Sequence, residues 1–391
     1  MSRALDGLTV LSLEQATVLP FLTYRLACDG ARVLRIENAA QPDPNRFVGR
    51  DVLGEPAMRS YFLPNNCGKE AITLNLAEPE GRALLRELLR ALRVDVFATN
   101  QRARSYARLG IDYPTLAAVA PELIWVGVTG FGPAHDEAAY DPILQARAGF
   151  MELTGEPDGP PTVFGLPMVD LGAAEHGYGE VMKALYRRAR GGGGARIDVS
   201  MLRSAVSWMT APLALGGSLG ERVARRGNTH QFFAPVSVFA TRDGWVYVAV
   251  GNDAQRAALA RLPALAGVDR PAYATNAGRI ADTARLHREV GAAFRRLATD
   301  EALVLLREAG VPVARVATLA DVVADPLVAP TLARVRDPRT GLEIVLPAPP
   351  AGDPPPLGFP PRLGEHNEKI YGGVLGYAPE RLAELRARGI I

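Results

Sequence analysis

The sequence has only two cysteines, Cys28 and Cys67, among its 391 residues. No Cys-x-x-Cys pair or Cys/His cluster surrounds either of them, so neither a structural zinc site nor a disulfide framework is indicated. No apolar run reaches the length that spans a bilayer. Residues 1–15 lack the apolar core of a secretion signal. We therefore expect a cytoplasmic protein with no membrane partner.

An excess of charge of one sign is also missing. The formal net charge is only +2, so bulk binding to nucleic acid is not expected. Lysine is scarce, with 3 residues against 41 arginines. Phosphate or carboxylate partners would therefore be bound mostly by guanidinium groups, which pair with such oxyanions bidentately. The content of 48% hydrophobic and 22% charged residues is ordinary for a globular protein, and the length favours two domains.

The motifs of several common enzyme classes are absent. No GxGxxG follows the first predicted strand, which removes support for a nicotinamide dehydrogenase. The glycines at 191–194 are not followed by the Lys-Ser/Thr pair of a phosphate-binding loop. There is no HExxH motif for metal hydrolysis and no GxSxG elbow for a Ser-His-Asp triad. The adjacent pair His135-Asp136 makes a poor catalytic dyad, because sequence neighbours rarely point at one substrate. We predict neither a metal nor a redox cofactor.

What the chain does contain is an alternation of apolar strands and helices that continues to about residue 200. A strand at 8–13, a helix at 21–29 and a strand at 31–37 form a βαβ unit, which implies a parallel sheet. The predicted fold class is α/β, with a large Rossmann-like domain formed by residues 1–210 and 330–391. Ligands of such sheets bind at the carboxyl ends of the strands.

The character of the sequence changes after about residue 210. Residues 225–320 combine a hairpin, with Asp243-Gly244 at its turn, and three helical stretches. This pattern predicts a smaller α+β domain. Segments 211–224 and 321–361 are predicted to be linkers, and the second contains the proline-rich run PAPPAGDPPPLGFPP.

The strongest candidate for chemistry lies in the segment 164–185, FGLPMVDLGAAEHGYGEVMKAL. Asp170 precedes a stretch of small residues with helical spacing, and we predict that it is the N-cap. Helix amides and the helix dipole would keep its carboxylate ionised even where burial opposes this. An ionised, rigidly held carboxylate is a candidate nucleophile, and the alternative is an ordinary cap. We interpret the nearby His176 as a packing or interface residue.

Eight segments, in order and spacing, resemble the class III CoA-transferases. This family includes the formyl-CoA:oxalate and carnitine CoA-transferases and α-methylacyl-CoA racemase. The resemblance covers essentially the whole chain, and each segment alone would be a weak match. The segments are LDGLTVLSLEQATVLPF, GARVLRIENAAQPDPNR, GKEAITLNL, FATNQRARSYARLGIDY, GFGPAHDEAAYDPILQARAGFMELTG, VFGLPMVDLGAAEHGYGEVMKAL, GVPVARVATLADVVADP and PRLGEHNEKIYGGVLGY.

The resemblance implies that Asp170 is the nucleophile of covalent catalysis, passing through an acyl-aspartyl anhydride and an aspartyl-CoA thioester. Acyl-CoA and a carboxylic acid would be the substrates, and the protein would form an interlocked homodimer. The family pattern also implies a set of coenzyme A contacts, in which the arginines suit the phosphates by their charge. These are Gln15, Ala16, Thr17, Arg35, Arg46, Asn100, Arg104 and Tyr140.

Two positions bear on which reaction and which substrate to expect. Tyr140 stands where the racemases carry a catalytic histidine, and a tyrosine with a pKa of about 10 is a poor substitute for imidazole. This favours transfer over racemisation. Some relatives carry a glycine-rich loop that covers the intermediate. The comparable stretch here is RRGNTHQFFAPVSVF, in which we expect Asn228, His230 and Gln231 to cap or select the acceptor.

A short dicarboxylic acid is the expected acceptor, with succinyl-CoA as donor. Arg225, Arg226 and His230 would bind its distal carboxylate, although solvated surface arginines are an equally good interpretation of that pair. Two alternatives remain besides the racemase. A catalytically inactive CoA-binding protein is disfavoured because Asp170 is present, and a nucleotide-dependent enzyme because no phosphate loop is found.

Overall fold

The computed structural model describes residues 3–391, which form two compact units. The first unit comprises the chain up to Gly149 together with Phe164–Leu219 and Pro330–Ile391. The second comprises Phe150–Val163 and Gly220–Ala329. The chain thus leaves the first unit twice, and the short stretch Phe150–Val163 was not anticipated as part of the second.

Six parallel strands form the sheet of the first unit, in the order β3-β2-β1-β4-β5-β6. The chain order reverses between β1 and β4, so the loops that follow these two strands diverge and open a crevice at the carboxyl ends. The predicted parallel α/β sheet is confirmed. Its strands are β1 (Thr9–Leu13), β2 (Arg32–Glu37), β3 (Lys69–Thr73), β4 (Val96–Thr99), β5 (Ile124–Thr129) and β6 (Ala195–Ser200).

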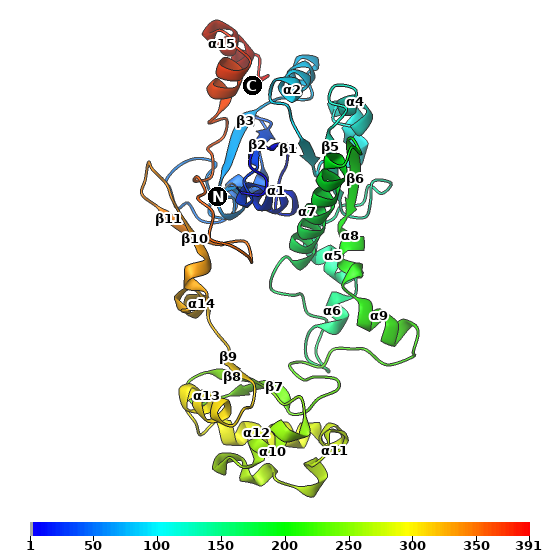
Figure 1. The fold of residues 1–391 in the computed structure, drawn as a ribbon, viewed down its shortest axis with the longest axis vertical. Coiled ribbons are helices and arrows are strands. Elements are labelled where there is room, and N and C mark those ends of the chain that lie inside the picture. Colours follow the sequence, from blue (N-terminus) through cyan, green and yellow to red (C-terminus); the bar gives the residue numbers. More distant parts are fainter. Residues whose placement is uncertain (1–2) are drawn as a thin grey trace. The chain divides into compact units, whose positions relative to one another are not determined.

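Helices cover both faces of this sheet. On one face, α1 (Val18–Cys28) packs along α7 (Met168–Ala189), as Figure 1 shows. The two helices approach closely at Gly177, where an added Cβ would lie 2.5 Å from a methyl group of Leu22. On the other face, Leu85 and Leu88 of α2 (Pro79–Ala91) pack with strand side chains such as those of Leu11, Phe97 and Trp125.

Shorter helices and one hairpin complete the first unit. The helices are α3 (Tyr106–Leu109), α4 (Tyr113–Ala117), α5 (Asp141–Arg147), α8 (Met201–Ser207), α9 (Thr210–Gly217) and α15 (Pro379–Ala387), with short turns η1 (Pro44–Phe47), η2 (Pro64–Asn66), η3 (Ala103–Ser105) and the π-helical η7 (Glu368–Val374). The hairpin pairs β10 (Leu332–Arg336) with β11 (Glu343–Pro347).

The closing segment of the chain covers the outer edge of β3. The amide of Thr73 donates to the side chain of Asn367 at 2.9 Å, and the amide of Ala71 donates to Nδ1 of His366 at 3.2 Å. An uncovered edge strand would leave such amides available to another chain, so this segment protects the sheet.

The second unit contains an antiparallel sheet in the order β7-β8-β9. The turn of the predicted hairpin closes as expected, with the amide of Thr241 donating to the carbonyl of Gly244 at 2.9 Å. Val246 and Val248 point from β8 into an apolar core shared with Leu286 and Val290. The elements are β7 (Val236–Ala240), β8 (Trp245–Ala249), β9 (Val313–Arg315), α6 (Phe150–Leu153), α10 (Asp253–Ala260), α11 (Asn276–Ala281), α12 (Thr283–Phe294), α13 (Thr299–Glu308) and α14 (Leu319–Ala324), with turns η4 (Pro263–Val268) and η5 (Pro271–Tyr273). The turn η6 (Ala329–Thr331) lies where the chain passes from the second unit back to the first.

Both segments predicted to be linkers contain regular structure. Within 211–224, the chain continues α9 as far as Gly217. Pro212 is tolerated there because amides in the first helical turn have no intrahelical partner to lose. Within 321–361, the β10–β11 hairpin includes the first proline of the proline-rich run, Pro347, and residues 348–361 form neither helix nor strand. Among residues 3–391, no helix is both long and apolar enough to cross a membrane.

Candidate active site

A pocket of about 420 Å³ opens at the carboxyl ends of β1, β4 and β5. It lies at the point where the strand order reverses, which is the usual ligand position in an open parallel sheet. All of the residues that line it belong to the first unit. They are residues 15–18, 44, 100–103, 105, 128–130, 135–141, 170 and 201.

Asp170 lines this pocket from the first turn of α7. The N-cap predicted at Asp170 is wrong, because α7 begins at Met168 and the residue in the cap position is Pro167, which makes no side-chain cap. The amides of Val169 and Asp170 instead donate to Oδ2 of Asp141, at 2.7 and 3.0 Å. The helix that carries Asp170 is therefore capped by a residue of another helix.

Asp141 is buried at the start of α5 and organises this corner of the site. Its Oδ1 accepts a hydrogen bond from Nε2 of Gln145 at 2.5 Å. Oε1 of Gln145 in turn accepts from the amide of Phe164 at 2.9 Å. Asp141 and Gln145 thus hold the segment that leads into α7, at Phe164, together with the first turn of that helix. Sequence reasoning missed this role, because an Asp-Pro pair marks a helix start but not which distant amides its carboxylate accepts.

The ionisation of Asp170 differs from the expectation based on a helix cap. Burial of the carboxyl group, and then the nearby Asp141 carboxylate, raise the pKa of Asp170 to about 7. The first-turn amides do not offset this, since those of Val169 and Asp170 are already bonded to Asp141. Near neutral pH both protonation states are populated. The ionised form is a stronger base than an ordinary aspartate, and nucleophilicity rises with basicity within one class of nucleophile.

The loop between β1 and α1 forms another part of the pocket wall. The main chain of Gln15 makes two hydrogen bonds with the side chain of Asn100, its amide donating at 3.1 Å and its carbonyl accepting at 2.8 Å. Ala16 has a positive φ of 63° and is held by the side chains of Asp43 and Asn45. Gln15, Ala16, Thr17 and Asn100, predicted from the sequence as contacts, therefore come together along one pocket. Tyr140 lines the same pocket and is 74% exposed.

The comparison with known families decides what kind of enzyme carries this pocket. The sequence profile described as CoA-transferase family III matches residues 5–367. The chain belongs to CoA-transferase family III. A CaiB/BaiF family protein from Brucella suis has a similar crystal structure, at a TM-score of 0.85 and 30% identity, covering 96% of this chain and 100% of that one.

Characterised relatives agree with this assignment. The chain is 29% identical to the human succinyl-CoA:glutarate CoA-transferase over 100% of this chain and 90% of that protein. It is 37% identical to the acetyl-CoA:oxalate CoA-transferase of Acetobacter aceti over 79% of each chain. The resemblance noted in the sequence is confirmed: this is a class III CoA-transferase, an enzyme of a family whose substrates are acyl-CoA thioesters.

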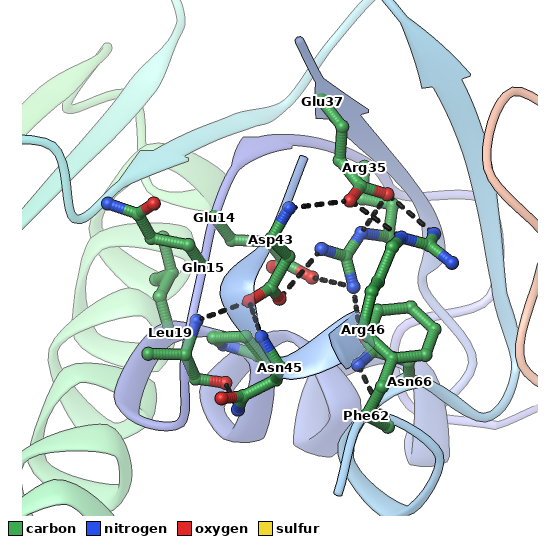
Figure 2. Close-up of polar contacts among 12 residues, drawn as sticks. Glu14, Gln15, Leu19, Arg35, Glu37, Asp43, Asn45, Arg46, Phe62 and Asn66 are labelled. Atoms are coloured by element: carbon green, nitrogen blue, oxygen red, sulfur yellow. Dashed lines mark hydrogen bonds and ion pairs between the residues drawn. The ribbon is translucent and has the colours of Figure 1, made fainter. Parts of the chain in front are cut away.

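Two arginines expected to meet the phosphates of a CoA-transferase substrate are instead buried. Arg35 and Arg46 are both 0% exposed and do not line the pocket. Arg46 makes two hydrogen bonds with Glu37, at 2.8 and 2.6 Å, and Arg35 pairs with Asp43 at 3.0 Å (Figure 2). The positive charge of these side chains suggested a phosphate partner, but carboxylates of the same chain neutralise both of them. We therefore no longer expect either arginine to contact a phosphate directly.

Arg104 lies beside the pocket rather than in its wall. Its side chain is 58% exposed and pairs at 3.6 Å with Asp136, which does line the pocket. Arg102 lines the pocket itself and was not selected from the sequence. The stretch QRARS offers two arginines near a short turn, and its pattern does not tell which one faces the ligand.

Asn228, His230 and Gln231 belong to the second unit, in a stretch without helix or strand. Oε1 of Gln231 accepts a hydrogen bond from Arg226 at 3.0 Å, and the ring of His230 lies 5.1 Å from that of Phe233 between centroids. Arg225 is engaged by Glu152 of its own unit at 2.7 Å. The predicted role of these residues in acceptor choice stays a prediction.

The side chain of His176 lies between α7 and the end of α8. Nδ1 of His176 lies 2.6 Å from the hydroxyl of Ser204, and its Nε2 accepts from the indole of Trp208 at 3.2 Å. With both ring nitrogens engaged in packing between helices, the histidine fits the structural role expected of it. Within the described part of the chain, no group of three or more His, Cys, Asp or Glu side chains is placed to hold a metal ion.

Proposed function

We propose that this CoA-transferase moves coenzyme A from an acyl-CoA donor to a dicarboxylic acid, with Asp170 as the covalent nucleophile. The observation that carries the proposal is the carboxylate of Asp170, which lies in the pocket at the switch point of the sheet and has a pKa raised to about 7. A carboxylate of that basicity remains ionised in a useful fraction at neutral pH and attacks acyl carbons more readily than an ordinary aspartate.

The proposed reaction exchanges carboxylate and thiolate at acyl carbons in four balanced steps. An oxygen of Asp170 attacks the thioester carbonyl, the C–S bond breaks, and an acyl-aspartyl anhydride and CoA thiolate result. The thiolate attacks the aspartyl carbonyl and releases the donor acid, leaving an aspartyl-CoA thioester. The acceptor carboxylate attacks this thioester and expels the thiolate. The thiolate then attacks the acceptor's acyl carbon and regenerates the Asp170 carboxylate.

The chain's own residues would position these groups. We propose that Gln15, Ala16, Thr17, Asn100 and Tyr140 contact the CoA thioester, because all five line the pocket with Asp170. Arg102 within the pocket and Arg104 beside it replace the two buried arginines as partners for CoA phosphates. Both activated intermediates hydrolyse if water reaches them, so the pocket must exclude water once it is occupied.

The acceptor class rests on the relatives. The human relative uses glutarate and the Acetobacter relative uses oxalate as acceptor, and both are dicarboxylic acids. We propose a short dicarboxylic acid here, with succinyl-CoA as the first donor to test. Asn228, His230 and Gln231 are the proposed residues that select it, and an interlocked homodimer is the proposed assembly.

The test is transfer from labelled succinyl-CoA to a panel of acids that includes glutarate and oxalate. We expect new acyl-CoA products with the wild type and a CoA adduct on the peptide that carries Asp170, detected by mass spectrometry. The Asp170→Ala variant should lose transfer by about 10³-fold or more. Asp198→Ala, which removes an exposed carboxylate on β6, is the matched control and should transfer normally.

Two outcomes would overturn this assignment. Unimpaired transfer by Asp170→Ala would exclude the aspartyl intermediates. Exchange of the α-proton of a branched acyl-CoA, without transfer to any acid, would instead favour a racemase.

A further inference from the structure

Ala16 holds an unusual backbone conformation in the wall of the pocket. Its φ of 63° lies in the left-handed region, which a residue with a Cβ seldom adopts without support from its surroundings. The support comes from two side chains. The amide of Ala16 donates to Oδ1 of Asp43 at 3.0 Å, and its carbonyl accepts from Nδ2 of Asn45 at 2.7 Å.

Asp43 is itself fixed on every side. It is 2% exposed. Its Oδ1 also accepts from the amide of Asn45 at 3.0 Å, and its Oδ2 accepts from Arg35 at 3.0 Å. The amide of Asp43 donates to Oε1 of Glu37 at 3.1 Å. The carboxylate that bonds Ala16 therefore cannot shift without disturbing Arg35 and Glu37.

Asp43 belongs to a larger group of buried charges. We define this buried charge network as the carboxylates Glu14, Glu37 and Asp43 and the cations Arg35, Arg46 and Lys69. Each of the six is at most 4% exposed, and their formal charges cancel. Arg35 is the central cation, at 3.0 Å from Asp43, 3.2 Å from Glu37 and 3.9 Å from Glu14 (Figure 2).

The network reaches the pocket loop at both ends. At one end Asp43 bonds Ala16. At the other, Glu14 pairs with Lys69 at 2.7 Å and directly precedes Gln15 in the chain. Buried ion pairs are a poor source of stability, because desolvation offsets most of their attraction. They do fix geometry, since moving one member exposes an uncompensated charge.

We propose that Asp43 is a positioning residue that, through the buried charge network, holds Ala16 in the left-handed conformation and so fixes the wall of the acyl-CoA pocket formed by residues 15–18. That the pocket binds acyl-CoA rests on the proposed function. The claim that Asp43 sets the conformation of Ala16 does not depend on the proposed function.

The central experiment pairs Asp43→Ala with Ala16→Gly. Glycine adopts a positive φ without a steric penalty, so it should tolerate the loss of Asp43. We expect Asp43→Ala to raise KM for acyl-CoA and the Kd for coenzyme A, measured by calorimetry, at least tenfold, while kcat changes less. Adding Ala16→Gly should recover at least threefold of the loss in both constants. The Ala16→Gly single variant completes the cycle, so that the effect of removing Asp43 is compared between wild type and the Ala16→Gly background.

A matched control separates positioning from stability. Asp337 is a buried aspartate that pairs with Arg362 at 2.8 Å and does not line the pocket. Asp337→Ala should lower the melting temperature by a similar amount to Asp43→Ala, yet leave KM and the Kd for coenzyme A within twofold. If Asp43→Ala folds poorly, Asp43→Asn keeps an acceptor for the Ala16 amide while losing the charge that pairs with Arg35. It should give a smaller rise in the same constants.

Several results would overturn the inference. These are an unchanged Kd for coenzyme A in both Asp43 variants, an equal effect of the Asp337 variant, or no recovery on adding Ala16→Gly. A crystal structure of Asp43→Ala with Ala16 still in the left-handed region would also overturn it. If the wild type fails to bind coenzyme A, the proposed function fails, and the same crystal structure still decides whether Asp43 sets the conformation of Ala16.

Discussion

The buried charge network and Asp170 place carboxylates at the same edge of one sheet but in opposite electrostatic surroundings. Burial alone would raise the pKa of Glu37, yet Arg35 and Arg46 outweigh it and lower that pKa to about 2. Burial also raises the pKa of Asp170, and there the interacting charge is the like-charged Asp141, so the pKa rises to about 7. Partners of opposite charge, and not the degree of burial, decide between the two outcomes.

The contrast separates two uses of a buried carboxylate. In the network every acid has a basic partner, and the two arginines also contact the ring of Phe62, whose centroid lies 3.9 Å from the guanidinium carbon of Arg46. Such a site is chemically inert and geometrically fixed. Burial and Asp141 raise the pKa of Asp170, and no basic side chain within residues 3–391 opposes them. The carboxylate therefore keeps the basicity that a nucleophile needs.

Breaking the network should have the largest effect on stability. Glu37→Gln removes the carboxylate shared by Arg35 and Arg46, and should lower the free energy of unfolding by about 3–5 kcal/mol in urea denaturation at pH 7, because it leaves buried cations uncompensated. The matched control Glu384→Gln removes an exposed helical partner of Arg388 and should leave the denaturation midpoint unchanged.

The pH dependence of this loss follows from the direction of the shift. The folded pKa of Glu37 is about 2, below its ordinary value of 4.5, so its contribution is complete above pH 4.5 and is lost as the pH falls towards 2. The difference between variant and wild type should therefore be constant from pH 5 to 7. A difference that grew on acidification would contradict the ionised state of Glu37.

Removing the charge of Asp170 should act in the opposite direction. Its folded pKa of about 7 lies above the ordinary value of 3.8, so stability falls as the pH rises from 3.8 to 7 and stays low above that. Asp170→Asn should therefore raise the free energy of unfolding by about 1–3 kcal/mol at pH 8.5, and by about half as much or less at pH 5. Thermal melts at both pH values test this, with Asp198→Asn as an exposed control. A loss of stability at pH 8.5 would contradict the uncompensated burial of this charge.

The smallest expected effect concerns Asp141. In Asp141→Asn the side-chain oxygen still accepts the amides of α7, but the like charge beside Asp170 is gone. The acid limb of the pH–rate profile for acylation should move to lower pH by about one unit or less. The shift is small because burial, the larger cause of the raised pKa of Asp170, remains. Single-turnover rates measured from pH 5 to 8 give this limb. Asp141→Ala also removes the cap and should lower stability by about 1 kcal/mol. An acid limb at the same pH in wild type and Asp141→Asn would show that Asp141 does not influence the nucleophile.

Much of the fold was accessible from the sequence because its signals are local. The apolar strands, the DG turn of the β7–β8 hairpin and the alternation that implies parallel pairing all depend on neighbours a few residues apart. The helix α9 within the predicted linker 211–224 was not anticipated, because Pro212 and the following glycines are typical of irregular chain, whereas a proline in the first turn leaves the helix intact.

Of the site, the order of motifs located Asp170, the loop that follows β1, Asn100 and Tyr140, and the structure brings all of them to one pocket. The motifs did not reveal that Asp141 caps α7 across 28 residues or that Arg102, and not Arg104, lines the pocket. Such facts depend on which side chains meet after folding, and no local pattern encodes them.

The sequence by itself determined the class of the fold, the family and the identity of the candidate nucleophile, because each follows from residue types in a fixed order. Only the tertiary structure decided the electrostatic state of the charged residues. Arg35 and Arg46 carry the same charge as Arg102, and Asp170 the same charge as Asp43. Their roles differ because a charge's behaviour is set by its solvation and by its partners, and both are properties of the folded chain.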